Sequence, residues 1–142
     1  QVVVMKQSDV GKYKTTDDLK NLKSIAIEGG SAGEKAAQAA GLTNTVVSDS
    51  QALALTEVTS GSADACIIDL TMANAMTGEG TGNKNLTYSI KLEAEEYGIA
   101  FRKGSDMTAK TNELMAGMMK DGTLDKLAKQ YQIVLIKNAD NK

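Results

Sequence analysis

Alternating apolar and polar runs divide the chain into short strands and amphipathic helices. A β-branched run at Val2–Met5 predicts a strand, and an almost wholly apolar run at Ala65–Leu70 predicts a second strand that is covered on both faces. Further strands are predicted at residues 24–27, 45–47, 86–92 and 97–102, and helices at residues 17–22, 31–40, 52–60 and 72–76. This alternation predicts an α/β fold, a three-layer sandwich with a mostly parallel central sheet.

The pattern changes after Gly104. Ser105 or Asp106 is expected to cap a helix whose apolar face carries Leu114 and three methionines, and a second helix follows the turn at 120–123. The prediction is therefore a helical tail appended to the α/β part.

Composition narrows the function. The chain has 142 residues, a net charge of −2, four Tyr, one Phe and no Trp, which argues against a nucleic-acid surface. It has no His, which removes Ser-His and Cys-His catalysis and most zinc sites, so we expect no catalytic residues, no metal and no cofactor. The single Cys66 lies in an apolar run and is interpreted as a small buried side chain.

Two segments carry candidate chemistry. The first, IAIEGGSAGEKAA at 25–37, predicts a strand, a glycine turn and a helix whose first backbone N–H groups can hold an anion. The second, DACIID at 64–69, places the carboxylate of Asp69 at the end of a neighbouring strand. A zwitterion such as a free amino acid carries a negative charge that suits the backbone N–H groups and a positive charge that suits the Asp69 carboxylate. On local sequence alone, Gly29 and Gly30 can also simply permit a tight turn, and Asp69 can be an ordinary capping acid.

Four segments in this order resemble one family. They are TDDLKNLKSIAIEGGSAGE at 16–34, GSADACIID at 61–69, EYGIAFRKG at 96–104, and MKDGT at 119–123 with KQY at 129–131. The chain resembles the second lobe of the bacterial amino-acid-binding proteins of ABC importers, which have a type II periplasmic-binding-protein fold. The resemblance implies that residues 1–103 form ligand-binding lobe 2 with both hinge strands, at 2–6 and 98–103. Residues 104–142 would pack on a first lobe that precedes this chain.

The resemblance also implies roles at the candidate site. Ser31 and the amides of Ala32 and Gly33 would meet the ligand α-carboxylate, with Gly30 in the turn beside them. Asp69 would accept the α-ammonium group. Glu28 would face the ligand side chain, which hints at a cationic amino acid, although a solvated strand end is an equal alternative.

The implied function is transport without chemistry. The chain would capture a free amino acid in a cleft between two lobes and deliver it to an ABC permease. Such receptors carry an export signal. They lie in the periplasm or are lipoproteins tethered at the cell surface. The chain looks like a piece of a longer protein that carries part of the site. Its tail would then be uncovered, which predicts a homodimer that is domain-swapped or joined by the tails.

Two alternatives remain open. The glycines at 29–33 could bind phosphate in a nucleotide-binding α/β domain, with Asp49 near the position expected of a ribose-binding acid. A dehydratase-like enzyme on a related fold is the other, although the absence of His argues against it.

Overall fold

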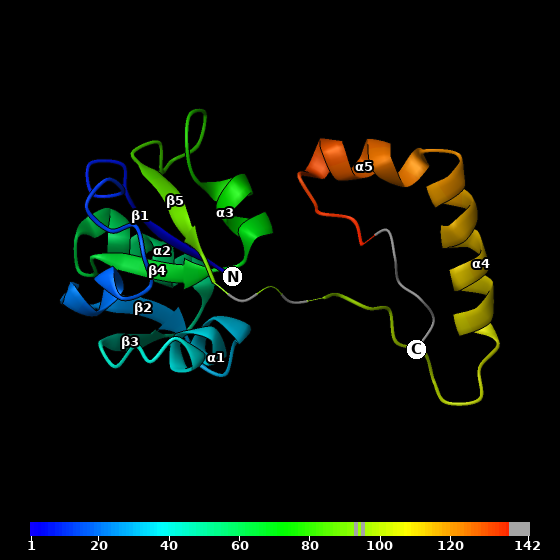
Figure 1. Cartoon of the computed structure of the whole chain (residues 1–142), viewed down its shortest axis with the longest axis horizontal. Helices are drawn as coiled ribbons and strands as arrows, with labels where there is room; N and C mark the ends of the chain where they lie inside the picture. Colours follow the sequence, from blue (N-terminus) through cyan, green and yellow to red (C-terminus); the bar gives the residue numbers. More distant parts are fainter. Residues whose placement is uncertain (93, 95, 137–142) are drawn as a thin grey trace. The chain divides into compact units, whose positions relative to one another are not determined.

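The computed structural model describes residues 1–92, 94 and 96–136, and it consists of two compact units. The first unit spans residues 1–95 and the second residues 96–142 (Figure 1).

The first unit is built on a mixed five-stranded sheet with the order β3-β2-β4-β1-β5. The strands are β1 (Val2–Lys6), β2 (Ile25–Glu28), β3 (Thr45–Ser48), β4 (Ala65–Ile68) and β5 (Leu86–Lys91). β2 pairs in parallel with β3 and β4, whereas β1 pairs antiparallel with β4 and β5. The α/β prediction is confirmed, and β1 is the strand that runs against the others.

Helices cover both faces of the sheet and make three layers (Figure 1). Side chains of β1 alternate between the two faces of the sheet, and both faces are buried. Val2 and Val4 belong to one hydrophobic core, and Val3 and Met5 belong to the other. The first core is closed by α2 (Gln51–Ser60) and α3 (Leu70–Met76). The second is closed by α1 (Ala32–Ala39) and the 3₁₀ helix η1 (Asp18–Asn21).

The ends of the helices follow local sequence signals. The Ser31 Oγ accepts a hydrogen bond from Glu34 N at 3.2 Å at the start of α1, and the Ser50 Oγ accepts one from Leu53 N at 3.2 Å at the start of α2. Gly61 ends α2 with φ +84°, a left-handed conformation that glycine adopts without strain. The nearby Ser48 does not cap α2, because its Oγ donates to Glu57 Oε1 at 2.8 Å.

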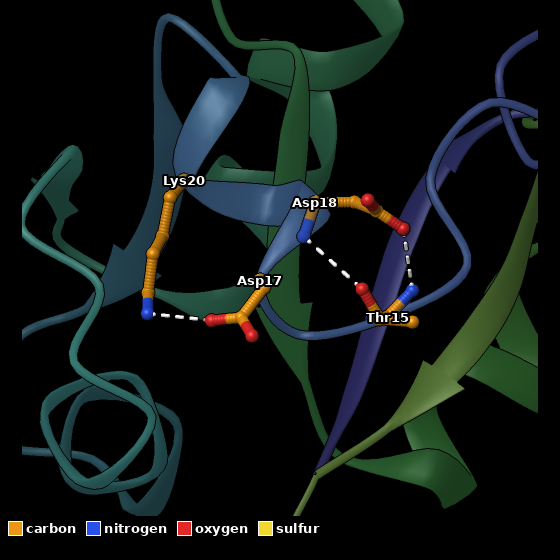
Figure 2. A network of polar contacts seen from close by, with 4 residues as sticks. All are labelled: Thr15, Asp17, Asp18 and Lys20. Carbon is orange, nitrogen blue, oxygen red and sulfur yellow. Dashed lines mark hydrogen bonds and ion pairs between the residues drawn. The ribbon is translucent and has the colours of Figure 1, made fainter.

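Figure 2 shows how the short η1 is held at its start. The Thr15 Oγ1 accepts from Asp18 N at 3.3 Å, and Asp18 Oδ2 accepts from Thr15 N at 2.8 Å, so each residue satisfies a backbone amide of the other. Hydrogen bonds from the backbone amides of Lys14 and Thr15 lower the pKa of the Asp18 carboxyl. Lys20 and Asp17 add an exposed ion pair at 2.6 Å, whose contribution to stability is small.

Two predicted strands differ from the structure. β4 ends at Ile68, because Asp69 is the N-cap of α3 and Leu70 is its first residue. The strand expected at 97–102 is wrong, since these residues form no strand. The role of residues 98–103 as a hinge stays a prediction. Tyr97 and Ile99 are 77% and 64% exposed, and an apolar run forms a strand only where another strand pairs with its backbone.

The second unit holds α4 (Met107–Lys120) and α5 (Thr123–Tyr131), joined by a turn at Gly122 with φ +81°. The predicted helical pair is confirmed, but none of its helical residues is buried. Large apolar side chains therefore lie on its surface, among them Leu114, Leu127 and Tyr131. None of the described helices is both long and apolar enough to cross a bilayer.

Cys66 generates a testable pH dependence, because it is buried at the centre of the sheet, as its sequence context predicts. Burial first, and the charge of Glu57 second, raise the pKa of its thiol from 9.0 to about 12. The unfolded chain therefore loses this proton before the folded chain does. We expect the free energy of unfolding to fall as pH rises between about 9 and 12, by up to about 1.4 kcal/mol per pH unit from this group.

Urea unfolding at stepped pH values measures this slope, and the Cys66→Ala variant is its control. The variant lacks the titrating thiol, so its stability should fall less steeply over the same range. Parallel pH profiles for the two proteins would contradict the assignment.

Candidate functional site

The carboxyl ends of β2, β3 and β4 lie at one edge of the sheet, because these strands are parallel. The start of β1 lies at the same edge, since β1 is antiparallel to β4 and Val2 pairs with Ile68. Figure 1 shows the arrowhead of β4 ending beside the N-terminus. The predicted site residue Glu28 ends β2 and Asp69 follows β4, so both are brought to one edge.

The start of α1 presents backbone amides at this edge. Ser31 N donates to Glu28 O at 3.3 Å, and Glu34 N is capped by the Ser31 hydroxyl. Among the described residues, no acceptor contacts the amides of Ala32 and Gly33. These two N–H groups lie at the positive end of the helix dipole, so they form a position suited to an anion.

Gly30 lies in the turn before the helix with φ +73°, which explains the glycine. The Gly30 amide already donates a hydrogen bond to Glu34 Oε2 at 2.6 Å. It is therefore less suited to bind an external anion than the amides of Ala32 and Gly33. The protein thus supplies its own carboxylate to the outer amide of this turn. An external carboxylate would meet the two inner amides and the Ser31 hydroxyl.

Asp69 is half-buried at the end of β4, and two glutamine side chains donate to its carboxylate. Gln1 Nε2 donates to Oδ1 at 2.5 Å, and Gln51 Nε2 donates to Oδ2 at 2.8 Å. Asp69 N in turn donates to Gln51 Oε1 at 2.9 Å. Its carboxylate does not cap α3 through a hydrogen bond, so the capping alternative does not account for its position.

The Gln1 side chain lies between Gly33 and Asp69. Its Oε1 lies 3.2 Å from the point where a Cβ of Gly33 would be, while its Nε2 contacts Asp69. The α1 start and the Asp69 carboxylate are therefore separated by one glutamine side chain. The structure brings together Ser31, Ala32, Gly33 and Asp69 at one edge of the sheet.

Of three other acidic residues, Glu28 and Asp49 lie at the same edge and Asp64 does not. Glu28 is half-buried at the end of β2, in register with Ser48 of β3. Asp49 is exposed just beyond β3. Asp64 lies at the opposite end of β4, where Oδ2 accepts from Lys23 N at 2.7 Å, so it is a structural residue.

Neither a cluster of metal-ligating side chains nor the crevice beside Lys6 is found among the predicted site residues, within the part of the chain that the structure describes. Within the described ranges, no group of three or more acidic or cysteine side chains could hold a metal ion. A crevice of about 570 Å³ lies at the other edge of the sheet, lined by Lys6, Thr59 and Asn85 among others, and it contains none of the predicted site residues.

Sequence reasoning missed Gln1, Gln51 and Glu34. Glu34 was detectable, because Ser31 with Glu34 three positions later has the spacing of a capping box. Gln1 and Gln51 contact Asp69 across 68 and 18 positions in the chain, and no local pattern signals such pairs.

The structure has the α/β fold of the periplasmic binding proteins, and the solved structures that it resembles are amino-acid-binding proteins. The chain is similar to a variant of ArgBP from T. maritima, with 28% identity and a TM-score of 0.71 over 92% of this chain and 56% of that chain. It is similar to the arginine-, lysine-, histidine-binding protein ArtJ from Geobacillus stearothermophilus, with 26% identity and a TM-score of 0.72 over 92% and 57%.

A third neighbour is the ancestral amino-acid-binding protein AncCDT-1, a precursor of cyclohexadienyl dehydratase. It has 27% identity and a TM-score of 0.72 over 92% of this chain and 56% of that chain. The chain thus spans a little over half the length of the solved structures that it matches. No protein-family model and no curated protein matches the sequence.

The close approach at Gly33 generates a prediction. A Cβ at this position would lie 3.1 Å from the carbonyl oxygen of Ile67 and 3.2 Å from Gln1 Oε1. Because Ile67 belongs to a buried strand, its backbone yields little, and α1 would have to move. We expect Gly33→Ala to lower the free energy of unfolding by about 1 kcal/mol, since overpacking outweighs the helix-propensity gain of alanine.

Urea unfolding monitored by circular dichroism measures the effect. Gly82→Ala is the matched control, because a Cβ there meets nothing within 4 Å. A Gly33→Ala protein as stable as the control would show that α1 does not press against β4.

Proposed function

We propose that this chain is the ligand-binding half of an amino-acid-binding protein that serves an ABC importer. One observation carries the proposal, namely that two inner amides of α1 and the Asp69 carboxylate lie at one edge of the sheet, with the Gln1 side chain between Gly33 and Asp69. The amides suit the α-carboxylate of an amino acid and Asp69 suits its α-ammonium group. The names of the neighbouring structures support the same ligand class.

The resemblance to amino-acid-binding proteins extends the proposal to the ligand side chain, a second lobe and the cellular location. Glu28 at the end of β2 favours a cationic side chain, which agrees with the ligands named for ArtJ. The chain holds part of the site, and a second lobe supplies the rest and closes over the ligand. The protein works outside the cytoplasm, in the periplasm or as a lipoprotein of the cell surface, delivers its ligand to a permease and performs no reaction.

Calorimetric titration tests the ligand class. The full-length natural protein that contains this chain should bind at least one of the twenty amino acids tightly. L-arginine and L-lysine are the first candidates. Asp69→Asn should weaken that binding by about 10- to 100-fold, because a charge-assisted hydrogen bond becomes a neutral one.

The Asp64→Asn variant is the matched control, since Asp64 lies at the far end of the same strand. ATP and inorganic phosphate serve as competing ligands, because the amides of Ala32 and Gly33 also suit a phosphate. Silence with all twenty amino acids, or tight binding of ATP alone, would overturn the proposal.

The exposed tail generates a prediction about association. Leu114, Tyr131 and Val134 are 65%, 58% and 77% exposed, which is unusual for large apolar side chains that lack a partner. We expect the 142-residue chain to form a two-fold homodimer through its tails or by exchange of segments. Light scattering after size-exclusion chromatography measures the mass.

Replacement of Leu114 and Val134 by Glu should shift the mass toward the monomer, because burial of two charges would then oppose the contact. Replacement of the exposed Thr56 on α2 by Glu is the control and should leave the mass unchanged. A monomer at high protein concentration contradicts the prediction.

A further inference from the structure

Gln51 makes an unusual pair of hydrogen bonds with a single residue. Its side-chain Oε1 accepts from the backbone N of Asp69 at 2.9 Å, and its Nε2 donates to the Asp69 Oδ2 at 2.8 Å. One planar amide therefore holds both the main chain and the carboxylate of Asp69. The two bonds close a ring that restricts the side-chain torsions of Asp69 relative to the strand that carries it.

The backbone of Gln51 is itself fixed. Gln51 is the first residue of α2, directly after the cap Ser50, and α2 buries Leu55 and Val58 against the sheet. The chain order places α2 after β3, yet α2 contacts β2 and β4. Because Gln51 begins α2, it lies at the end of the helix that is close to the carboxyl end of β4, where it contacts Asp69.

The two side-chain amides that hold the Asp69 carboxylate are uncharged. An ionised carboxylate can accept about four hydrogen bonds, and the donors from Gln1 and Gln51 are neutral amides. Neutral donors of this kind orient a carboxylate and carry no charge of their own. A cationic group that approaches Asp69 therefore meets a carboxylate already turned in one direction.

We propose that Gln51 is a positioning residue for recognition of the ligand ammonium group, acting through Asp69 and not by contact with the ligand. This inference rests on the proposed function. By fixing the Asp69 carboxylate before the ligand arrives, Gln51 removes part of the ordering cost of binding. The β3–α2 connection thereby becomes part of the ligand site although none of its residues is a predicted ligand contact.

The pairing is tested first in the ligand-free 142-residue chain by ¹⁵N-¹H NMR. The Gln51 side-chain amide resonance, identified by its absence in Gln51→Ala, should lie downfield of exposed glutamine amides and return toward them in Asp69→Ala. The Asp69 backbone amide should exchange faster with solvent in Gln51→Ala. A Gln51 resonance at the position of exposed glutamines would overturn the inference.

The role in binding is tested by calorimetry with L-arginine, or with the amino acid that the titration above identifies, on the longest natural form of the chain. Gln51→Ala should weaken binding on the order of 10-fold. Gln51→Glu keeps the acceptor for the Asp69 amide but sets a carboxylate against Oδ2, so it should weaken binding at least as much. Gln38→Ala, on the exposed side of α1, should stay within twofold of the wild type.

The outcomes separate the two proposals. Unchanged affinity in Gln51→Ala, with a wild type that binds, overturns the role of Gln51 and leaves the proposed function intact. A wild type that binds no amino acid overturns the proposed function, and the role of Gln51 in binding falls with it. Weakened binding in both Gln51 variants, together with the NMR signature and an unaffected Gln38→Ala, supports the inference.

Discussion

The pairing of β4 with β2 on one side and with β1 on the other places every group of the candidate site. Parallel pairing with β2 brings the start of α1 and the end of β4 to the same edge. Antiparallel pairing with β1 brings the first residue of the chain to that edge as well, where Gln1 contacts Asp69. Reversal of either pairing would move one of these groups to the far end of the sheet. The site thus depends on strand direction before it depends on any side chain.

Both parts of the candidate site are held in place by other residues of the chain. The Ser31 hydroxyl caps the Glu34 amide of α1, and the Glu34 carboxylate accepts from the Gly30 amide in the preceding turn. The two amides between them, of Ala32 and Gly33, remain for an anion. Gln1 and Gln51 hold the acid. Interactions at a helix start contribute about 0.3–1 kcal/mol each when exposed, so orientation matters as much as strength here. A site with weak individual contacts gains selectivity when each contact is fixed in advance.

Local sequence signals predicted much of this fold. Ser31, Ser50 and Gly61 mark helix ends through hydrogen bonds or φ values that depend on their own few neighbours. The strand expected at 97–102 was wrong for the opposite reason, because a strand depends on a partner that its own sequence does not specify. The same distinction applies at the site. The amides of α1 and the acid of β4 were visible in sequence, whereas the glutamines that orient Asp69 come from distant positions.

The burial of Cys66 has a practical consequence. Its thiol is protonated at neutral pH, because its pKa is raised to about 12, and the sheet shields it from reagents. A second cysteine introduced at exposed Asp49, next to the candidate site, would therefore carry the only reactive sulfur among the described residues. A fluorophore attached there would report on the surroundings of α1 and β4 without removal of the natural cysteine.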